Sequence, residues 1–317
     1  MKEAVRDIGE LERLLELPKE SLAGATGRLA AFPLLVPREF IARMNKRDPF
    51  DPLLRQVLPT AAEHTDAQGY SHDPLSEFPL AHHGSISKYP GRVLLITTGA
   101  CPVHCRYCFR REFPYPGQTA SRDDWQPALE SIRRTPAVRE VILSGGDPLS
   151  ISNERLSALV AGIESLPKIE SLRIHTRFPI VLPARVDDGL IEILDSTRLN
   201  TVVVVHANHP AEIDDSVKAA TSALKRATNY LLNQSVLLRG INDNVETLIQ
   251  LSERLQDASI VPYYLHLLDR VSGAAHFDVA EEKAIALLAA MRRQTSGYLV
   301  PTLVRDQAGE LSKTPIG

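Results

Sequence analysis

The three cysteines of the chain, Cys101, Cys105 and Cys108, all lie in the segment CPVHCRYC. Three thiols on one loop offer soft ligands for three irons of a cubane iron–sulfur cluster, with the fourth iron left open for a substrate or cofactor. A structural zinc site normally needs a fourth ligand, and His104 is a poor one because it is adjacent to Cys105. A zinc site and three ordinary buried thiols are the alternatives. The spacing favours an iron–sulfur cluster.

A glycine-rich segment, LSGGDPL, contains Gly145, Gly146 and Asp147 and follows the next predicted strand after the cysteines. Alone, such a segment is typical of a tight turn that caps a helix. Glycine also lets the backbone approach a ligand closely. Because this turn comes one βα unit after the cysteine loop, we expect it to contact a cofactor bound there.

Two more polar groups stand near the ends of the predicted core. Lys313 lies in GELSKTPIG, where the following Thr-Pro favours a constrained turn over a helix. A lysine in that position is otherwise an ordinary solvated charge. The segment KYPGRVLLI holds Lys88, Tyr89 and Arg92 just before the first predicted barrel strand. Two cations and a phenol suit a phosphate dianion, and a solvated strand entrance is the alternative.

Alternating strands and helices must position these residues. From residue 93 onward, short apolar or β-branched runs alternate with longer amphipathic stretches, which is typical of βα units around a parallel sheet. The predicted strands span residues 93–100, 140–147, 171–176, 201–208, 230–238 and 260–269. Six such units predict a partial (β/α)6 TIM-like barrel, with the chemistry at the carboxyl ends of the strands.

The predicted barrel core covers residues 86–296 and is flanked by two different segments. Residues 1–85 contain helical fragments punctuated by proline and predict a helical N-terminal cap packed on the barrel. Residues 297–317 form a C-terminal segment that carries Lys313 and has no obvious closing element. The expected fold class is therefore α/β, a partial barrel with an N-terminal helical cap.

Composition and charge narrow the class of partner. The formal net charge of -3 and the pI of about 6.4 give no sign of the broad basic surface that nucleic-acid binding needs. No run approaches the roughly 18 apolar residues of a membrane span, and the N-terminus has no apolar signal core. An odd number of cysteines argues against a disulfide framework. We expect a cytoplasmic protein that acts on small molecules or proteins.

The motif Cys101-x3-Cys105-x-Tyr107-Cys108 resembles the signature of the radical S-adenosylmethionine superfamily. From about residue 35 onward the chain resembles the lysine 2,3-aminomutase family, and within it the branch that makes β-lysine for elongation factor P. The resemblance implies the partial barrel of that superfamily. It also implies a 4Fe-4S cluster on the three cysteines, with S-adenosylmethionine bound to the fourth iron.

The resemblance also implies where the cofactors bind. The expected contacts to S-adenosylmethionine are Tyr107, Gly145, Gly146, Asp147 and Gln234. Lys313 matches the lysine that binds pyridoxal 5′-phosphate covalently. The residues that match the surroundings of its phosphate are Lys88, Tyr89 and Arg92.

Substrate contacts follow from the same resemblance. Arg110 matches the arginine that holds the α-carboxylate of the amino acid, for which a planar guanidinium is well suited. Asp269 and Asp306 match the acidic pair that holds the ε-ammonium group in lysine-specific members. His206 and His209 match a prominent family segment, and we assign them no chemistry.

The implied activity is an isomerisation of L-α-lysine to β-lysine, in which the amino group moves from C2 to C3. The implied partners are L-lysine, an electron donor such as flavodoxin or ferredoxin, the ligase that attaches β-lysine to elongation factor P, and a second copy in a homo-oligomer. A free-lysine mutase of metabolism is one alternative. A non-catalytic iron–sulfur sensor that binds S-adenosylmethionine is another, although it would not need Lys313, Asp269 and Asp306 together.

Overall fold

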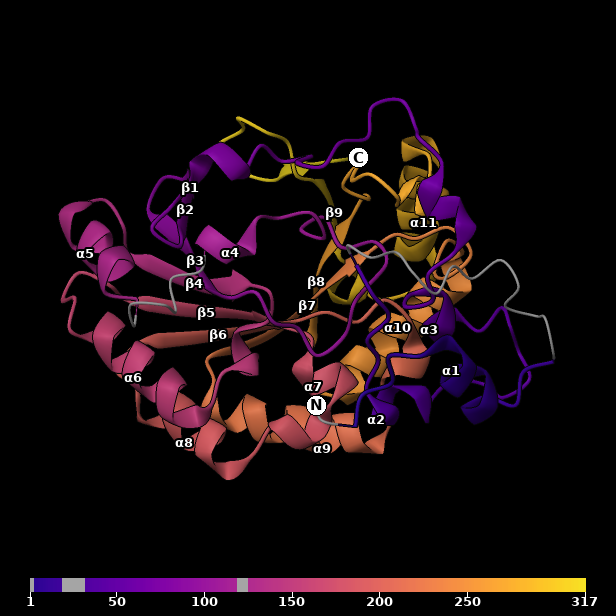
Figure 1. The fold of residues 1–317 in the computed structure, drawn as a ribbon, viewed down its shortest axis with the longest axis horizontal. Coiled ribbons are helices and arrows are strands. Elements are labelled where there is room, and N and C mark those ends of the chain that lie inside the picture. Colours follow the sequence, from indigo (N-terminus) through magenta and orange to yellow (C-terminus); the bar gives the residue numbers. More distant parts are fainter. Residues whose placement is uncertain (1–2, 19–31, 119–124) are drawn as a thin grey trace.

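The computed structural model describes residues 3–18, 32–118 and 125–317, and this part of the chain is built around a ten-stranded sheet (Figure 1). The strands are β1 (Ala81–His82), β2 (Ser85–Tyr89), β3 (Arg92–Thr98), β4 (Glu140–Gly145), β5 (Ser171–Thr176), β6 (Asn200–Val205), β7 (Tyr230–Val236), β8 (Val261–His266), β9 (Thr302–Arg305) and β10 (Thr314–Pro315). Each strand pairs with the one before it. Strands β3 to β9 are parallel, while β1, β2 and β10 are antiparallel to their neighbours.

The six predicted strands are all present, as β3 to β8, and the α/β partial barrel is confirmed. The C-terminal segment differs from the expectation, because it does contain closing elements. Strand β9 extends the parallel sheet beyond β8, and β10 folds back on β9. These strands have four and two residues, so they are too short to show a hydrophobic period in the sequence.

The longer helices follow the strands and cover the outer side of the sheet (Figure 1). They are α5 (Gln126–Arg134), α6 (Asn153–Glu164), α8 (Asp188–Ser196), α9 (Asp215–Ala227), α10 (Val245–Asp257) and α11 (Glu281–Gln294). Their first turns are fixed by side-chain caps. Asp214 accepts a hydrogen bond from the amide of Val217 at 3.0 Å, and Asn244 accepts one from that of Thr247 at 2.9 Å. These caps satisfy amides that would otherwise lack partners, so each helix starts at a defined residue.

Short helices fill the loops and the N-terminal region. They are α1 (Ile8–Leu14), α2 (Arg38–Ile41), α3 (Pro52–Arg55), α4 (Tyr115–Gln118), α7 (Phe178–Val181), η1 (Ala61–His64), η2 (Phe78–Leu80), η4 (Pro148–Ser150), η5 (Pro183–Arg185), η6 (Pro210–Glu212), η7 (Ala275–Phe277) and η8 (Gly297–Leu299). Helices α1 to α3 lie beside the barrel near α7 and α10 (Figure 1). Part of the predicted cap, residues 1–2 and 19–31, falls outside the described residues.

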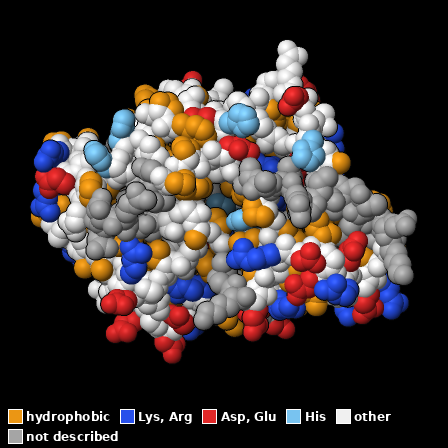
Figure 2. Space-filling view, viewed as in Figure 1, with side chains coloured by type: hydrophobic (Ala, Val, Ile, Leu, Met, Phe, Trp, Pro, Cys, Tyr) orange, Lys and Arg blue, Asp and Glu red, His pale blue; other side chains and the backbone are white. Residues whose placement is uncertain are grey.

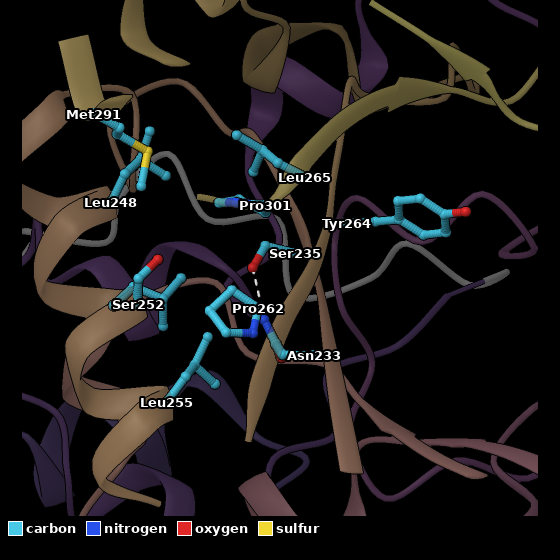
Figure 3. Close-up of a pocket in the computed structure, with 11 residues that line it drawn as sticks. Asn233, Ser235, Leu248, Ser252, Leu255, Pro262, Tyr264, Leu265, Met291 and Pro301 are labelled. Atoms are coloured by element: carbon cyan, nitrogen blue, oxygen red, sulfur yellow. Dashed lines mark hydrogen bonds between the residues drawn. The ribbon is translucent and has the colours of Figure 1, made fainter. Parts of the chain in front are cut away.

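The two faces of the curved sheet differ in chemistry. In β7, Asn233 and Ser235 are buried on the outer side, where they line a small pocket with α10 and α11 (Figure 3). Tyr264 of β8 extends away from that pocket. Because side chains alternate along a strand, Gln234 faces the opposite, inner side. The inner side of the barrel therefore carries polar residues at the carboxyl ends of the strands.

Acidic and basic side chains are intermingled along the edges of the face in Figure 2. This mixture agrees with the small net charge of -3. Within the described residues, no helix is both long and apolar enough to cross a membrane.

Candidate active site

The thiol loop, residues 99–114, follows β3 and carries all three cysteines, which are free thiols. The N-terminal region holds this loop through its backbone. The amide of His104 donates to the carbonyl of Leu35 at 3.0 Å, and the amide of Arg106 donates to that of Gln56 at 2.8 Å. Within the loop, the Cys108 amide donates to the Cys105 carbonyl at 3.1 Å and forms a turn. The loop is thus shaped by contacts far apart in sequence.

The thiols are close enough to influence one another. Burial raises the pKa of Cys101 well above its usual value, and Asp147, Cys108 and Cys105 raise it further. Burial and then Cys105 raise the pKa of Cys108 to about 11. A cation bound among the thiols would reverse this repulsion, because coordination to a metal deprotonates a thiol.

A buried ion pair braces the thiol loop. Arg106 donates through Nε to Glu63 Oε1 at 2.8 Å and through Nη2 to Oε2 at 2.6 Å, and both side chains have no exposed area. Arg111 adds a bond to the same Oε2 at 2.6 Å. Burial raises the pKa of Glu63, but the two guanidinium groups outweigh it and the pKa is lowered overall. Glu63 therefore ties the part of the thiol loop from Arg106 to Arg111 to η1.

The glycine turn at the end of β4 packs directly against the start of the thiol loop. Gly145 has a φ of +107°, a conformation that side chains disfavour. At Gly146, a Cβ atom would lie 2.4 Å from the carbonyl oxygen of Ala100, so a larger residue cannot fit. The amide of Gly146 donates to the Thr98 carbonyl at 2.7 Å. These two glycines therefore allow the backbone of the turn to pack closely against the backbone of Thr98 to Ala100, beside Cys101.

Asp147 joins the glycine turn to the end of β5. Its carboxylate accepts hydrogen bonds from Thr176 Oγ1 at 2.8 Å, from the Arg177 amide at 2.7 Å and from the Leu149 amide at 3.0 Å. Burial raises its pKa to about 6, although these donors act in the opposite direction. The carboxylate is thus occupied within the protein, and any contact of this turn with a cofactor is better made by its backbone.

Arg110 lies near the end of the thiol loop, 6% exposed, and has a carboxylate partner that the sequence did not suggest. Its Nε and Nη2 donate to the two oxygens of Glu77 at 2.8 and 3.1 Å, and Nη1 donates to Ser144 Oγ at 3.0 Å. Burial lowers the pKa of Arg110, but Glu77 outweighs it and raises the pKa overall. Glu77 and Ser144 thereby fix the orientation of the guanidinium.

A second polar cluster lies at the opposite edge of the sheet, where β2, β9 and β10 meet. Asp306 Oδ1 accepts from Lys88 Nζ at 2.7 Å and from Tyr89 OH at 2.8 Å, and Oδ2 accepts from Lys313 Nζ at 2.7 Å. The guanidinium of Arg92 lies 4.4 Å from the centre of the Tyr89 ring. Burial raises the pKa of Asp306, but Lys313 and Lys88 outweigh it and hold the pKa well below its usual value. We call these five residues the lysine cluster.

Asp269 follows β8 and faces the lysine cluster. Burial raises its pKa to about 7, while Lys313 lowers it and Asp306 raises it. Among the described residues, its carboxylate has no hydrogen-bond partner. A desolvated carboxylate without a partner favours a cationic ligand, because such a ligand would offset the cost of burying its charge.

Three histidines line the inner side of the barrel between the two clusters. Burial lowers the pKa of His206 to about 3, and Arg177, Lys313 and Arg110 add to this effect. Gln234 Nε2 lies 3.1 Å from His206 Nε2. The Nε2 atoms of His175 and His266 are buried without a partner in the described part of the chain. The ring centres of His175 and His206 are 5.9 Å apart, so the ends of β5 and β6 bring two imidazoles together on the inner side of the barrel.

Comparisons with known proteins identify the family. A family model described as the radical SAM superfamily matches residues 95–251. The L-lysine 2,3-aminomutase of Escherichia coli strain K12 is 46% identical over 318 residues, which cover 100% of this chain and 93% of that protein. The chain belongs to the L-lysine 2,3-aminomutase family.

Two further members of the L-lysine 2,3-aminomutase family show how far the similarity extends. The enzyme of Haemophilus influenzae is 43% identical over 315 residues, covering 99% of this chain and 93% of that protein. The enzyme of Clostridium subterminale is 37% identical over 328 residues, covering 100% of this chain and 76% of that protein. The similarity thus includes the N-terminal region and the lysine cluster as well as the barrel.

This family of isomerases uses radical S-adenosylmethionine chemistry, which implies a 4Fe-4S cluster and S-adenosylmethionine. The residues present fit these groups. Three free thiols share one loop, and the neighbouring glycine turn has no side chain to obstruct a ligand. Arg177 Nε is a buried donor without a partner among the described residues, beside Cys105. In these residues no three His, Cys, Asp or Glu side chains already form a metal-holding group, so the fit depends on donor chemistry.

The structure places the sequence-predicted residues in two groups and adds others that the sequence did not suggest. Tyr107, Arg110 and the three cysteines lie on the thiol loop, and Gln234 faces the interior beside His206. His209 instead accepts from the Ala211 amide through Nδ1 at 3.2 Å and caps η6. The added residues are Glu63, Glu77, Arg177, Glu212 and His266. The first four have ion-pair partners that are distant in the sequence, and His266 Nε2 is buried without a partner among the described residues, so no local motif marks any of them.

Proposed function

We propose that this protein converts L-α-lysine to β-lysine by moving the amino group from C2 to C3. The observation that carries the proposal is the lysine cluster, which faces the same interior as the thiol loop, with Asp269 beside it. Asp269 would suit the ε-ammonium group of a lysine molecule, and Arg110 would suit its α-carboxylate. Lys313 would suit the attachment of the cofactor that binds the α-amino group. The 46% identity to an L-lysine 2,3-aminomutase supports the same reaction.

On the thiol side, Cys101, Cys105 and Cys108 would hold the 4Fe-4S cluster. The backbone of Gly145 and Gly146 would contact S-adenosylmethionine, Tyr107 and Gln234 would lie beside it, and Asp147 would hold the turn in place. When bound, the cluster and S-adenosylmethionine supply the oxidising species that removes hydrogen from C3 of the substrate. The protein residues bind and orient these groups.

On the other side, the lysine cluster would hold pyridoxal 5′-phosphate. Lys313 is the residue for covalent attachment, and Lys88, Tyr89 and Arg92 would donate to the phosphate. Asp306 accepts hydrogen bonds from both lysines and holds their amino groups close together. A lysine must lose a proton before it can attack a carbonyl, so the contact between Lys313 and Asp306 would have to break when the cofactor is attached. Residues 297–317 would thus form the cofactor-binding segment of the barrel.

The substrate would be held at both ends. Arg110, held in place by Glu77, would bind the α-carboxylate. Asp269 and Asp306 would bind the ε-ammonium group. Since burial raises the pKa of Asp269 to about 7, a bound ammonium would favour its ionised form. Neutral amino acids lack this charge and would leave the carboxylate unpaired.

The finer assignments extend the same proposal. We place the protein in the branch that supplies β-lysine for elongation factor P, acting in the cytoplasm before the β-lysine ligase. An electron donor such as flavodoxin or ferredoxin would reduce the cluster, and the protein would work as a homo-oligomer. Residues 1–85 would act as a cap and residues 86–296 as the radical S-adenosylmethionine core.

The direct test is product analysis with anaerobically purified, cluster-reconstituted protein. Labelled L-lysine should yield β-lysine when S-adenosylmethionine, pyridoxal 5′-phosphate and a reductant are all present. A mutase for free lysine gives this result without a partner. The effect of losing the protein on growth and on translation of polyproline sequences then separates the metabolic role from the translational one. Binding of S-adenosylmethionine with no rearranged amino acid would instead identify a sensor and overturn the proposal.

A further inference from the structure

Arg177 is the first residue after β5 and connects three parts of the thiol side. Its amide donates to Asp147 Oδ2 at 2.7 Å, which attaches it to the glycine turn. The side chain is 9% exposed, and its guanidinium lies 5.8 Å from the centre of the Phe40 ring in α2. An arginine in such a place is costly to bury unless its donors are used.

The guanidinium of Arg177 contacts the cysteine motif itself. Nη1 donates to Cys105 Sγ at 3.1 Å and also to the hydroxyl of Tyr107. Nη2 donates to Glu212 Oε2 at 2.6 Å. Nε is buried and has no partner among the described residues. The cation therefore lies against a sulfur that would ligate iron, with one donor left over.

Glu212 fixes the direction of this guanidinium. Its Oε1 accepts from the amide of Asn208 at 2.8 Å, from that of His209 at 3.0 Å and from Gln56 Nε2 at 3.0 Å. A carboxylate with that many donors cannot turn freely. The bond from Arg177 to Cys105 is consequently held by a network that reaches the N-terminal region and the end of β6.

A buried cation beside a cysteine ligand has a predictable effect on an iron–sulfur cluster. Reduction adds negative charge to a cluster that thiolates already make anionic. Positive charge and N–H donors to the sulfurs stabilise the reduced form and raise the reduction potential. Removing such a cation should make reduction harder.

We propose that Arg177 is a positioning residue for the iron–sulfur centre, which orients Cys105 and Tyr107 and raises the reduction potential of the cluster. The inference rests on the part of the proposed function that places a 4Fe-4S cluster on the three thiols. It does not depend on which amino acid is rearranged.

The test compares Arg177→Gln and Arg177→Lys with the wild-type protein after anaerobic reconstitution. Arg173→Gln is the matched control, because Arg173 lies on β5, four residues before Arg177, and is paired with Glu140 at 2.6 Å, away from the cysteines. Iron and sulfide content, thermal unfolding and an EPR-monitored redox titration are measured for each. The potential should move to more negative values in Arg177→Gln, move less in Arg177→Lys and stay unchanged in Arg173→Gln.

Each outcome bears on the proposal. An Arg177→Gln protein with full iron content and the wild-type potential would overturn it. If Arg177→Gln retains no cluster, the Arg177→Lys variant decides. A wild-type iron content and reduction potential in Arg177→Lys would overturn the proposal, and a shift of its potential to more negative values would support it. Loss of the cluster from both variants, with unchanged thermal unfolding and a loaded Arg173→Gln control, supports the positioning role. A wild-type protein that binds no cluster would instead refute the proposed function.

Discussion

The thiol loop and the lysine cluster are built by different means. The thiol loop is held by backbone hydrogen bonds and by the pair Arg106 and Glu63, whose side chains have no exposed area. The lysine cluster is held by one carboxylate shared among three donors, and the side chain of Lys313 keeps 23% of its area exposed.

This difference separates two ways of preparing a site. Buried hydrogen bonds with distant partners keep the thiol loop in one shape whether or not a ligand is present. Opposite charges around Asp306 can exchange partners when a phosphate or an ammonium group enters. We therefore expect substitutions near the thiols to affect assembly of the site, and substitutions in the lysine cluster to affect ligand affinity and turnover.

The largest effect is expected from replacing any one of the cysteines. Cys101→Ala, Cys105→Ala or Cys108→Ala should abolish reductive cleavage of S-adenosylmethionine, because a cluster with only two protein ligands is not retained. The measurement is 5′-deoxyadenosine formed under dithionite. Wild-type amounts from a single variant would show that this thiol is not a ligand.

Lys313→Ala should abolish mutase activity and remove the visible absorption of covalently bound pyridoxal. Cleavage of S-adenosylmethionine without substrate turnover should persist, because the thiol loop does not depend on the lysine cluster. Borohydride reduction followed by peptide mapping checks the assignment in the wild-type protein. A pyridoxyl group found on Lys88 instead would exchange the roles of the two lysines.

Glu63→Gln tests the brace of the thiol loop. Breaking a buried ion pair and leaving Arg106 without its partner typically costs about 3–5 kcal/mol. Urea unfolding should therefore show a lower free energy of unfolding, and reconstitution should give less iron per chain. Glu130→Gln serves as the control, since Glu130 pairs with Arg133 and Arg134 on the surface. Equal losses in both variants would contradict a special role for Glu63.

Asp269→Asn and Asp306→Asn should each lower kcat/KM for lysine by roughly 10- to 100-fold, since a charge-assisted contact is worth roughly 1.5–3 kcal/mol. The two effects should not add in the double variant, because both carboxylates serve one ammonium group. Asp306→Asn should also weaken retention of pyridoxal phosphate, while Asp269→Asn should not. Unchanged kinetics in both single variants would overturn the lysine assignment.

The smallest effect is a pH dependence of lysine binding. Burial raises the pKa of Asp269 from 3.8 to about 7, so its carboxylate loses charge as the pH falls below about 7. KM for lysine should rise several-fold at about pH 6, and Asp269→Asn should lack this change. The same shift makes the contribution of this group to stability fully present below about pH 4 and lost as the pH rises through about 7. Thermal unfolding of the wild-type protein and of Asp269→Asn at about pH 4 and about pH 7 checks the direction of this change in stability.

Local patterns in the sequence were sufficient to predict the barrel and to recognise the thiol motif. Strands β3, β4 and β6 each bury a run of mostly apolar residues, and β5 and β7 alternate buried with less buried positions, so these patterns are visible without tertiary information. Cys101, Cys105 and Cys108 are within one loop, and their spacing alone suggested the chemistry.

Long-range partners could not be predicted in the same way. Glu63 and Glu77 are surrounded by ordinary polar residues in the sequence, and only the fold brings them to Arg106 and Arg110. Strands β9 and β10 are too short to show the alternation of apolar and polar residues that marks a strand in the sequence. The cofactor contact expected of Asp147 stays a prediction, and its hydrogen bonds from Thr176 and Arg177 could not be foreseen from the sequence. Sequence distance, more than residue type, limited the prediction.

The sequential order of the strands has a consequence for synthesis of the protein on the ribosome. Each strand pairs with the one made just before it, so the sheet can grow as the chain emerges. Lys88 must nevertheless wait for Asp306, which is 218 residues later. A nascent chain that has reached β8 already contains the thiol loop, the glycine turn and the inner histidines, but not yet Asp306 and Lys313 of the lysine cluster. On the proposed function, the residues for the iron–sulfur cluster are therefore translated before the residues for pyridoxal phosphate are complete.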